Sequence, residues 1–134
     1  MRELAQMTFA RHVRVAEGDG AKSNIELFAC PGDSRLVLTS VRVMADNANS
    51  VDVGVQVGFG TAAVPTPALA ENDGIAFDHP GVSQGGGAVV NNNGEPIAYG
   101  AKDEDLRYTC EEATGGSISI IVHGYVDGYN EASL

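Results

Sequence analysis

The most informative pattern in the chain is a strict alternation of apolar residues with small or polar ones over residues 51–60. The odd positions are all apolar: Val51, Val53, Val55, Val57 and Phe59. The even positions are Asp52, Gly54, Gln56, Gly58 and Gly60. Because successive side chains of a strand point to opposite faces, this alternation predicts a strand with one buried face and one nearly bare face. Glycine lets another backbone come close, so Gly54, Gly58 and Gly60 are candidate positions for close approach by a neighbouring subunit or a covering loop.

Other alternating or β-branched runs predict further strands, separated by turns rich in glycine, proline, asparagine and aspartate. These strands are expected near residues 9–15, 25–29, 36–45, 88–90, 97–100, 106–110 and 117–126. The polar segment 46–50 predicts an antiparallel hairpin between 36–45 and 51–60. The turn at 111–116 predicts a second hairpin, between 106–110 and 117–126.

The middle of the chain, about residues 61–95, is rich in breaks and is expected to be a surface excursion. Asp78-His79-Pro80-Gly81 is a predicted break, and residues 69–73 are compatible with one helical turn. The whole pattern predicts an all-β fold: an antiparallel, jelly-roll-like β-sandwich of about eight or nine strands. We expect a single domain over residues 9–134, preceded by an N-terminal arm over residues 1–8.

The charge of the chain limits the partners it can have. The 134 residues include 18 Asp and Glu against 8 Lys and Arg, which gives a formal net charge of −10. No cation surplus is available to neutralise phosphates, which argues against binding to nucleic acid or to an anionic membrane. The apolar runs are far shorter than the roughly 20 residues that a spanning helix needs.

The three histidines are the strongest candidates for a metal or catalytic centre. His12 and His123 lie in predicted strands and could be neighbours in a sheet, where we expect each to line a polar face, and His79 is expected in a turn. A jelly-roll enzyme would need His12 and His123 to converge with a carboxylate on a metal ion. Ser83 lies in a Gly-x-Ser-x-Gly sequence (residues 81–85), but this stretch lacks the strand-to-helix context of a nucleophile elbow and is expected to be a flexible loop. We therefore expect no catalytic, cofactor-binding or metal site, and no enzymatic activity.

The cysteines, an acidic turn and the tyrosines each allow two interpretations. Cys30 and Cys110 fit no zinc spacing, and packed, reduced thiols are favoured over a disulfide between them. The acidic run 102–105 is expected to be a solvated turn rather than a calcium site. The tyrosines form a candidate binding surface, with core or interface packing as the alternative: Tyr99, Tyr125 and Tyr129.

The C-terminal part of the chain carries a resemblance to a known family. The segments IAYGA (97–101), EDLRYTC (104–110) and TGGSISI (114–120) are followed by a β-branched strand with an aromatic, Tyr125. Over about residues 97–126 this pattern resembles small virion proteins of tailed bacteriophages, of the capsid decoration (cement) type. The resemblance implies a β-sandwich, often trimeric, bound to the outside of a capsid, with an N-terminal arm that engages the shell.

Three hypotheses of different classes follow. The first is a non-enzymatic phage virion protein that decorates and stabilises the capsid exterior by bridging capsomers. It would be a homo-oligomer, with a trimer favoured, whose partner is the major capsid protein, and it would assemble onto the virion in the host cytoplasm. The second is a ligand- or glycan-binding module of a virion fibre or surface protein, which would use the tyrosines. The third is the jelly-roll enzyme.

Overall fold

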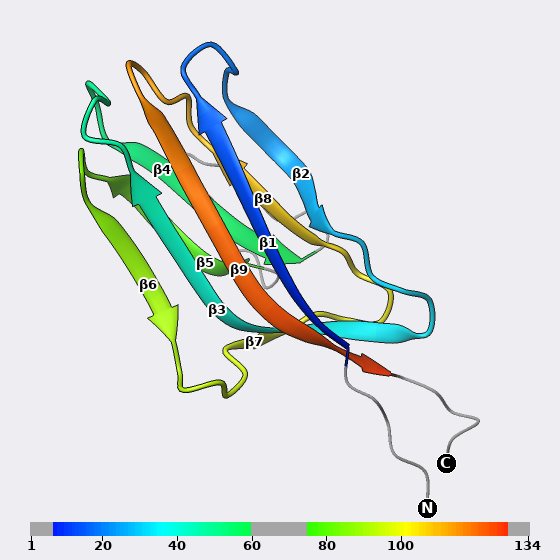
Figure 1. Cartoon of the computed structure of the whole chain (residues 1–134). Coiled ribbons are helices and arrows are strands. Elements are labelled where there is room, and N and C mark those ends of the chain that lie inside the picture. Colours follow the sequence, from blue (N-terminus) through cyan, green and yellow to red (C-terminus); the bar gives the residue numbers. More distant parts are fainter. Residues whose placement is uncertain (1–6, 60–74, 129–134) are drawn as a thin grey trace, which may run out of the picture.

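The computed structural model describes residues 7–59 and 75–128, and every regular element in these ranges is a β-strand (Figure 1). The strands are β1 (Met7–Ala16), β2 (Lys22–Phe28), β3 (Ser34–Ala45), β4 (Val53–Phe59), β5 (Ile75–Val82), β6 (Gly87–Asn91), β7 (Ala98–Tyr99), β8 (Leu106–Cys110) and β9 (Ser117–Gly128). Within the described ranges, no helix is long and apolar enough to cross a membrane.

The strands form two antiparallel sheets that face each other. Sheet A has the order β1-β9-β3-β6, with β7 pairing to β3, and sheet B has the order β2-β8-β4-β5. Figure 1 shows sheet A in front and sheet B behind it. The pairs β1 with β9, β2 with β8, β3 with β6 and β4 with β5 are nested in the sequence. This nesting is the winding of a jelly roll, so the predicted all-β, jelly-roll-like sandwich is confirmed.

Both predicted hairpins are wrong. Strand β3 pairs with β9, β6 and β7, whereas β4 pairs with β8 and β5 in the other sheet. Likewise β8 belongs to sheet B and β9 to sheet A. The connections 46–52 and 111–116 therefore carry the chain from one sheet to the other. Segment 46–52 is rich in Asp and Asn, and segment 111–116 ends in two glycines. Both look like hairpin turns because a crossing loop also needs residues that tolerate sharp backbone bends.

The two crossing connections hydrogen-bond to each other. The Asp46 amide donates to the Ser117 carbonyl at 2.9 Å, and the Ser50 amide donates to the Thr114 carbonyl at 2.7 Å. The Asn49 side chain is buried between the loops, and its Nδ2 donates to the Ser117 carbonyl at 2.8 Å. These bonds satisfy backbone amides and carbonyls of the two connections that have no partner on a neighbouring strand. The two connections can therefore pack closely together.

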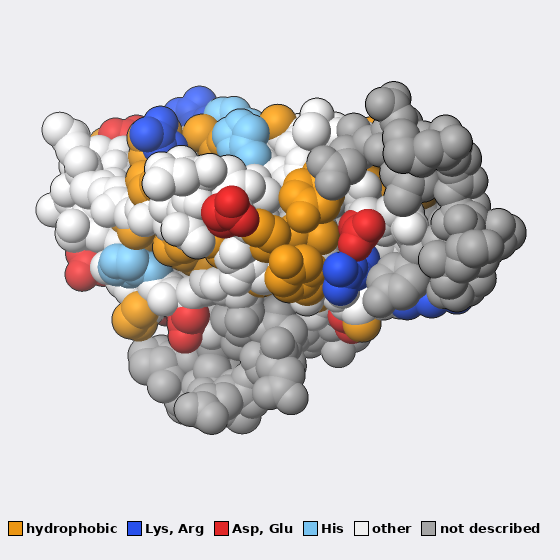
Figure 2. Space-filling view, turned by 90° about the horizontal axis from the view of Figure 1, so that it is seen from below, with side chains coloured by type: hydrophobic (Ala, Val, Ile, Leu, Met, Phe, Trp, Pro, Cys, Tyr) orange, Lys and Arg blue, Asp and Glu red, His pale blue; other side chains and the backbone are white. Residues whose placement is uncertain are grey.

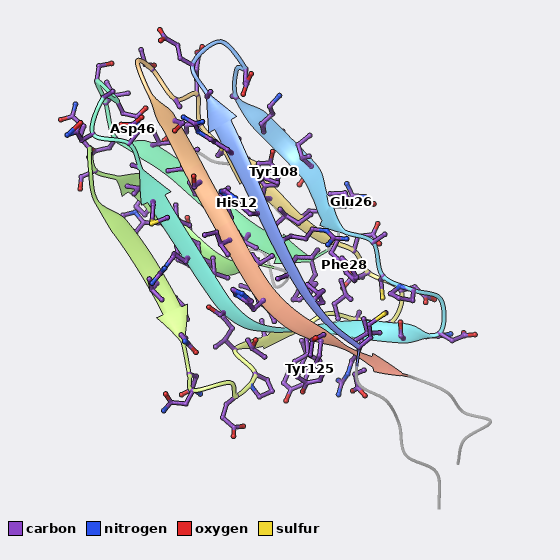
Figure 3. All side chains as sticks on the ribbon, viewed as in Figure 1. His12, Glu26, Phe28, Asp46, Tyr108 and Tyr125 are labelled. Atoms are coloured by element: carbon purple, nitrogen blue, oxygen red, sulfur yellow. The ribbon has the colours of Figure 1, made fainter. Side chains whose placement is uncertain are left out.

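The core lies between the inner faces of the two sheets. Its fully buried aliphatic side chains, each stabilising the fold by roughly 1.5–3 kcal/mol, include Val15, Leu36, Leu38, Val41, Val43, Leu106, Ile118, Ile120 and Val122. At the edge where β1 faces β2, the Phe9 and Phe28 rings stack with centroids 4.4 Å apart. The Arg11 guanidinium lies 4.8 Å from the Phe28 centroid, and these three side chains close that edge of the sandwich. Figure 3 labels Phe28 there.

Strand β4 is buried on both faces. Val53, Val55, Val57 and Phe59 belong to the core as the alternation predicts, but Val51 lies before the strand and is 53% exposed. The alternate face was expected to be nearly bare, yet Gly54, Gln56 and Gly58 are buried too. At Gly54 the cover is the Glu111 carboxylate and the Pro80 carbonyl, which can lie close because glycine has no side chain.

Strand β5 lies inside the segment that was expected to be a surface excursion. Its Phe77 and Val82 side chains are buried in the core, so that expectation is wrong for this part of the segment. The predicted break around Pro80 lies within the strand. Strand β5 is the edge of sheet B, and its register slips by one residue between Val82 and His79. An edge position with a bulge tolerates a proline, which has no amide to donate. The helical turn considered at 69–73 lies outside the described residues.

Gly124 in β9 offers a direct test of this packing. An added Cβ would lie 2.6 Å from Phe9 Cζ and would also press on the Val37 carbonyl oxygen. We therefore expect Gly124→Ala to lower the free energy of unfolding by about 1–3 kcal/mol, the usual cost of overpacking a core. Urea denaturation followed by circular dichroism measures this change.

Gly128 in the same strand is the matched control, because an added Cβ there meets no atom of residues 7–59 and 75–128 within 4 Å. Gly128→Ala should leave the unfolding midpoint nearly unchanged. Equal midpoints for the two variants would contradict the described packing of β9.

Candidate interaction face

The outward side of sheet A presents its side chains in four cross-strand rows. The strand register fixes these rows, because directly paired residues point to the same side of a sheet. The rows are Arg14, Ser119, Met44 and Gly87; His12, Ile121, Arg42 and Val89; Ala10, His123, Ser40 and Asn91; and Thr8, Tyr125, Val37 and Tyr99. We call this surface the outer face of sheet A.

One row brings two of the predicted tyrosines together. Tyr99 on β7 and Tyr125 on β9 both pair with Val37 on β3. Tyr99 is 55% exposed, whereas Val37 between the rings is fully buried. Figure 3 shows Tyr125 at the lower end of β9. The third residue of the predicted set, Tyr129, lies outside the described residues.

Charged groups flank the tyrosine row. The Arg35 guanidinium lies 4.6 Å from the Tyr99 ring centroid, and its Nε donates to Asp127 Oδ2 at 2.9 Å. The pKa of Tyr125 is raised, first by desolvation and then by the negative charges that Tyr99 and Asp127 can carry. Tyr125 therefore stays a neutral hydroxyl over the physiological range, able to donate and accept hydrogen bonds.

The middle of the face is cationic and contains a shallow hollow of about 500 Å³. The hollow is lined by Thr39, Ser40, Arg42, Val89, Asn91, Gly94, Ile121 and His123. In the end-on view of Figure 2, blue and pale-blue side chains (Lys, Arg and His) gather along the upper side of the molecule. No Asp or Glu occurs in the four rows, which is unusual for an acidic chain.

The two strand histidines lie on this face, as predicted for a polar surface. His12 pairs with Ile121, which lies two residues from His123, so the histidines are diagonal neighbours on adjacent strands. Both are exposed. Among residues 7–59 and 75–128, no group of three His, Cys, Asp or Glu side chains is placed to hold a metal ion. The convergence that the enzyme hypothesis needs is therefore not seen there. His79 lies in β5, where its Nδ1 accepts the Gly81 amide at 3.2 Å.

The glycine face of β4 is approached by the chain itself at Gly54. The Gly54 amide donates to Glu111 Oε1 at 2.8 Å, and the Glu111 amide donates to the Gly54 carbonyl at 2.8 Å. A Cβ at Gly54 would press on that carboxylate and lie 2.9 Å from the Pro80 carbonyl oxygen. The close approach at Gly54 is thus intramolecular. Gly58 is buried, and Gly60 lies outside the described residues.

The acidic run 102–105 forms a turn whose carboxylates bind backbone amides. Asp105 Oδ1 accepts the Cys30 amide at 2.7 Å, and Asp103 Oδ1 accepts the Asp33 amide at 2.9 Å. Glu104 Oε1 accepts the Ala101 amide at 2.9 Å. The Asp105 and Asp103 bonds fasten the loop after β2 to the loop before β8, and the Glu104 bond closes the turn itself, so all three have a structural role.

Cys30 and Cys110 are free thiols, so the prediction of packed thiols rather than a disulfide is confirmed. Cys30 is half-buried, with Sγ 3.4 Å from the Ser34 carbonyl oxygen. Cys110 is fully buried, and desolvation raises its pKa to about 11.

Sequence reasoning missed the arginines of this face. Arg14 and Arg42 in its rows, and Arg35 beside the tyrosine row, were not singled out, although the strands that carry them form two of the predicted elements. The available signal is that residues 7–16 and 34–45 contain arginines and no acidic residue. That signal gains meaning only when the register places both strands in one sheet.

Comparisons with known proteins agree with this architecture. No family model matches the chain, and no curated protein matches it. Among solved structures, the chain is similar to one from the acidic stable capsid structure of Helicobacter pylori bacteriophage KHP30. That match has a TM-score of 0.50 and 11% identity, and covers 89% of this chain and 87% of that chain.

Two other phage capsid chains match with lower TM-scores. They come from the capsid of Ralstonia phage GP4 (TM-score 0.48, 18% identity, 93% of this chain and 86% of that chain) and from the cyanophage Pam1 capsid (0.42, 15%, 93% and 89%). Of these three matches, the KHP30 match alone shows that the chain shares its β-sandwich fold with a chain of a phage capsid structure. The likeness to phage virion proteins predicted from residues 97–126 is confirmed in the fold.

The two thiols should differ sharply in reactivity. The thiolate is the reactive form, and Cys110 is both buried and held as a thiol. In the native protein at pH 8, we expect a disulfide reagent to titrate Cys30 first and to leave Cys110 unmodified until urea is added. Mass mapping of the modified cysteine gives the readout, with Cys30→Ser as the control. Rapid native labelling of Cys110, or a Cys30–Cys110 disulfide, would contradict the described packing.

Proposed function

We propose that the chain is a non-enzymatic structural protein of a phage virion, which decorates and stabilises the capsid exterior by bridging capsomers. The observation that carries the proposal is the nested strand order of a complete jelly roll. The similarity of this chain to a chain of a phage capsid structure, which covers 89% of this chain, supports the proposal.

The surface of the domain suits a binding role. A broad sheet face with exposed Tyr99, Met44 and Val89 is available for protein contacts. Decoration multiplies modest contacts, because the symmetry of a shell repeats each contact many times. In this proposal the partner is the major capsid protein, the chain is a homo-oligomer with a trimer favoured, and it joins the virion surface during assembly in the host cytoplasm.

The proposed arm over residues 1–8 would add a second attachment to the shell. Its last two residues, Met7 and Thr8, are the first two of β1, and the preceding ones lie outside the described residues. An arm that continues from β1 would leave the sandwich beside the tyrosine row, since Thr8 pairs with Tyr125.

Deleting the gene for this chain from the phage that encodes it tests the decoration role. We expect capsids to assemble without the protein and to break at a lower temperature, because the bridges between capsomers are gone. Thermal release of packaged DNA, followed by dye fluorescence, measures that temperature. Adding the purified protein back to the deficient capsids should restore the wild-type value.

Two results would count against the decoration role. One is complete failure of shell assembly, which would make the chain part of the shell itself. The other is absence of the chain from purified wild-type virions, judged by quantitative mass spectrometry. A monodisperse monomer with no affinity for the deficient capsids would also contradict the proposal.

The tyrosine row favours a second candidate function, the binding of a glycan or another ligand at the virion surface. Aromatic rings beside hydrogen-bonding groups suit sugar recognition, and Tyr99 lies beside Arg35 and close to Tyr125. On a broad glycan array, we expect any binding to be abolished by Tyr99→Ala and retained by Met44→Ala, which alters an exposed residue at the other end of the same face. No binding across the array would exclude this function for the sugars displayed.

A further inference from the structure

Positive charge is concentrated on one sheet of this acidic protein. The strands of sheet A carry four arginines, of which Arg14 and Arg42 lie in the outer rows. The other two are Arg11, which pairs with the buried Val122 and lies over Phe28, and Arg35. Asp127 is the single acidic residue in these described strands, and it is ion-paired with Arg35 at 2.9 Å. The chain as a whole has a net charge of −10. The negative charge must therefore lie elsewhere, and the outer face of sheet A is locally positive.

Carboxylates gather at one end of the sandwich, on the connections β1–β2, β3–β4 and β8–β9. They are Glu17, Asp19, Asp46, Asp52, Glu111 and Glu112, and these three described connections contain no Lys or Arg. Figure 3 labels Asp46 at this upper end. The connections lie side by side, because the Glu17 amide donates to the Gly116 carbonyl at 2.8 Å and the Ser50 amide donates to the Thr114 carbonyl at 2.7 Å. We call this surface the acidic loop end.

The outer face of sheet A also has the composition of an interface. Protein interfaces are enriched in arginine, methionine and tyrosine, and depleted in lysine, glutamate and aspartate. The four rows contain Arg14, Arg42, Met44 and two tyrosines, with no lysine and no acidic residue. Met44 is 43% exposed and Val89 is 54% exposed, so apolar surface accompanies the positive charge.

We propose that the outer face of sheet A binds the acidic loop end of a second copy of this chain. Charge complementarity identifies the occupant, because each copy supplies both the cationic face and the anionic end. The 500 Å³ hollow, lined in part by Arg42 and His123, can receive a carboxylate from a loop tip. Glu17 and Glu112 suit this role because both side chains are exposed at that end.

Such a contact joins two different surfaces, so it is heterologous and generates either a closed ring or an open array. The inferred contact rests on the proposed function in one respect, which is that a decoration protein self-associates. It deepens that function by naming the two surfaces.

A polyanion such as nucleic acid is the competing occupant of the positive face. The net charge of the chain disfavours it, since long-range repulsion acts on any large anion.

Charge reversal of either surface tests the contact. The variant Arg14→Glu/Arg42→Glu reverses the face, and Glu17→Lys/Glu112→Lys reverses the loop end. Each should weaken self-association by about tenfold or more, because like charges placed across an interface repel strongly. Sedimentation velocity over a concentration series measures the dissociation constant, and circular dichroism checks that each variant is folded.

Combining the variants makes the test specific. The variant with all four substitutions carries a negative face and a positive end, so it should self-associate again. Mixing the two separate variants should give hetero-oligomers in which the variants alternate at 1:1, since each variant carries two surfaces of one sign and is attracted only to the other variant. Lys102→Glu and Glu26→Lys, which change the same charges outside both surfaces, should leave association within about twofold of wild type.

Salt gives an independent readout. Raising the salt concentration from about 0.1 M to about 1 M shortens the screening length from about 10 Å to about 3 Å, so wild-type association should weaken markedly. Association that is insensitive to salt, or that survives both reversals in folded protein, would overturn the proposal. So would a failure of the mixed variants to pair, or binding of duplex DNA by the wild-type face without self-association.

Failure of this inference is distinguishable from failure of the proposed function. Incorporation of the reversed variants into the deficient capsids depends on contacts with the shell, and it can persist while self-association is lost. If wild-type protein self-associates as described but never binds a capsid, the surfaces named here stand and the decoration role falls.

Discussion

The structure depends on one constraint: long strands that follow one another in the chain lie mostly in opposite sheets. Each such connection must cross the edge of the sandwich and find hydrogen-bond partners outside any ladder. The crossings after β3 and β8 solve this by binding each other, with Asn49 buried between them. Because of these crossings, residues distant in sequence become neighbours in both sheets. The outer face of sheet A is therefore assembled from strands that are far apart in the chain.

The alternation of the chain predicted the strands well and their partners poorly. The odd positions of β4 point into the core as expected, since the period of two is a property of the strand itself: Val53, Val55, Val57 and Phe59. The two hairpins were wrong because a polar loop of five or six residues suits a tight reversal and a crossing equally. Strand β5 was missed because Pro80 argues against a ladder, and nothing local shows that this strand is at an edge with a bulge.

In the candidate site, likewise, the residues could be recognised from the sequence but their neighbours could not. The tyrosines were recognised as a set from their chemistry, but their common neighbour, Val37, follows only from the register of three strands. The glycines of β4 were recognised as places of close approach, whereas the partner at Gly54 turned out to be Glu111 of the same chain. The separation of charge was present in the sequence throughout. This separation becomes visible only when β1, β3, β6 and β9 are grouped into sheet A and the three acidic connections are grouped into the acidic loop end.

The position of β9 has a consequence for biosynthesis. This strand lies between β1 and β3, yet it is the last of the described strands to be translated. Until it arrives, β1 has no neighbour in its sheet, and β3 has one bare edge of unpaired amides and carbonyls. For most of its synthesis a nascent chain therefore lacks the partner for one edge of β1 and one edge of β3. Unpaired strand edges can pair with other chains, which favours aggregation at high expression. Rapid insertion of β9, or a chaperone that shields the unpaired edges of β1 and β3, would limit this aggregation.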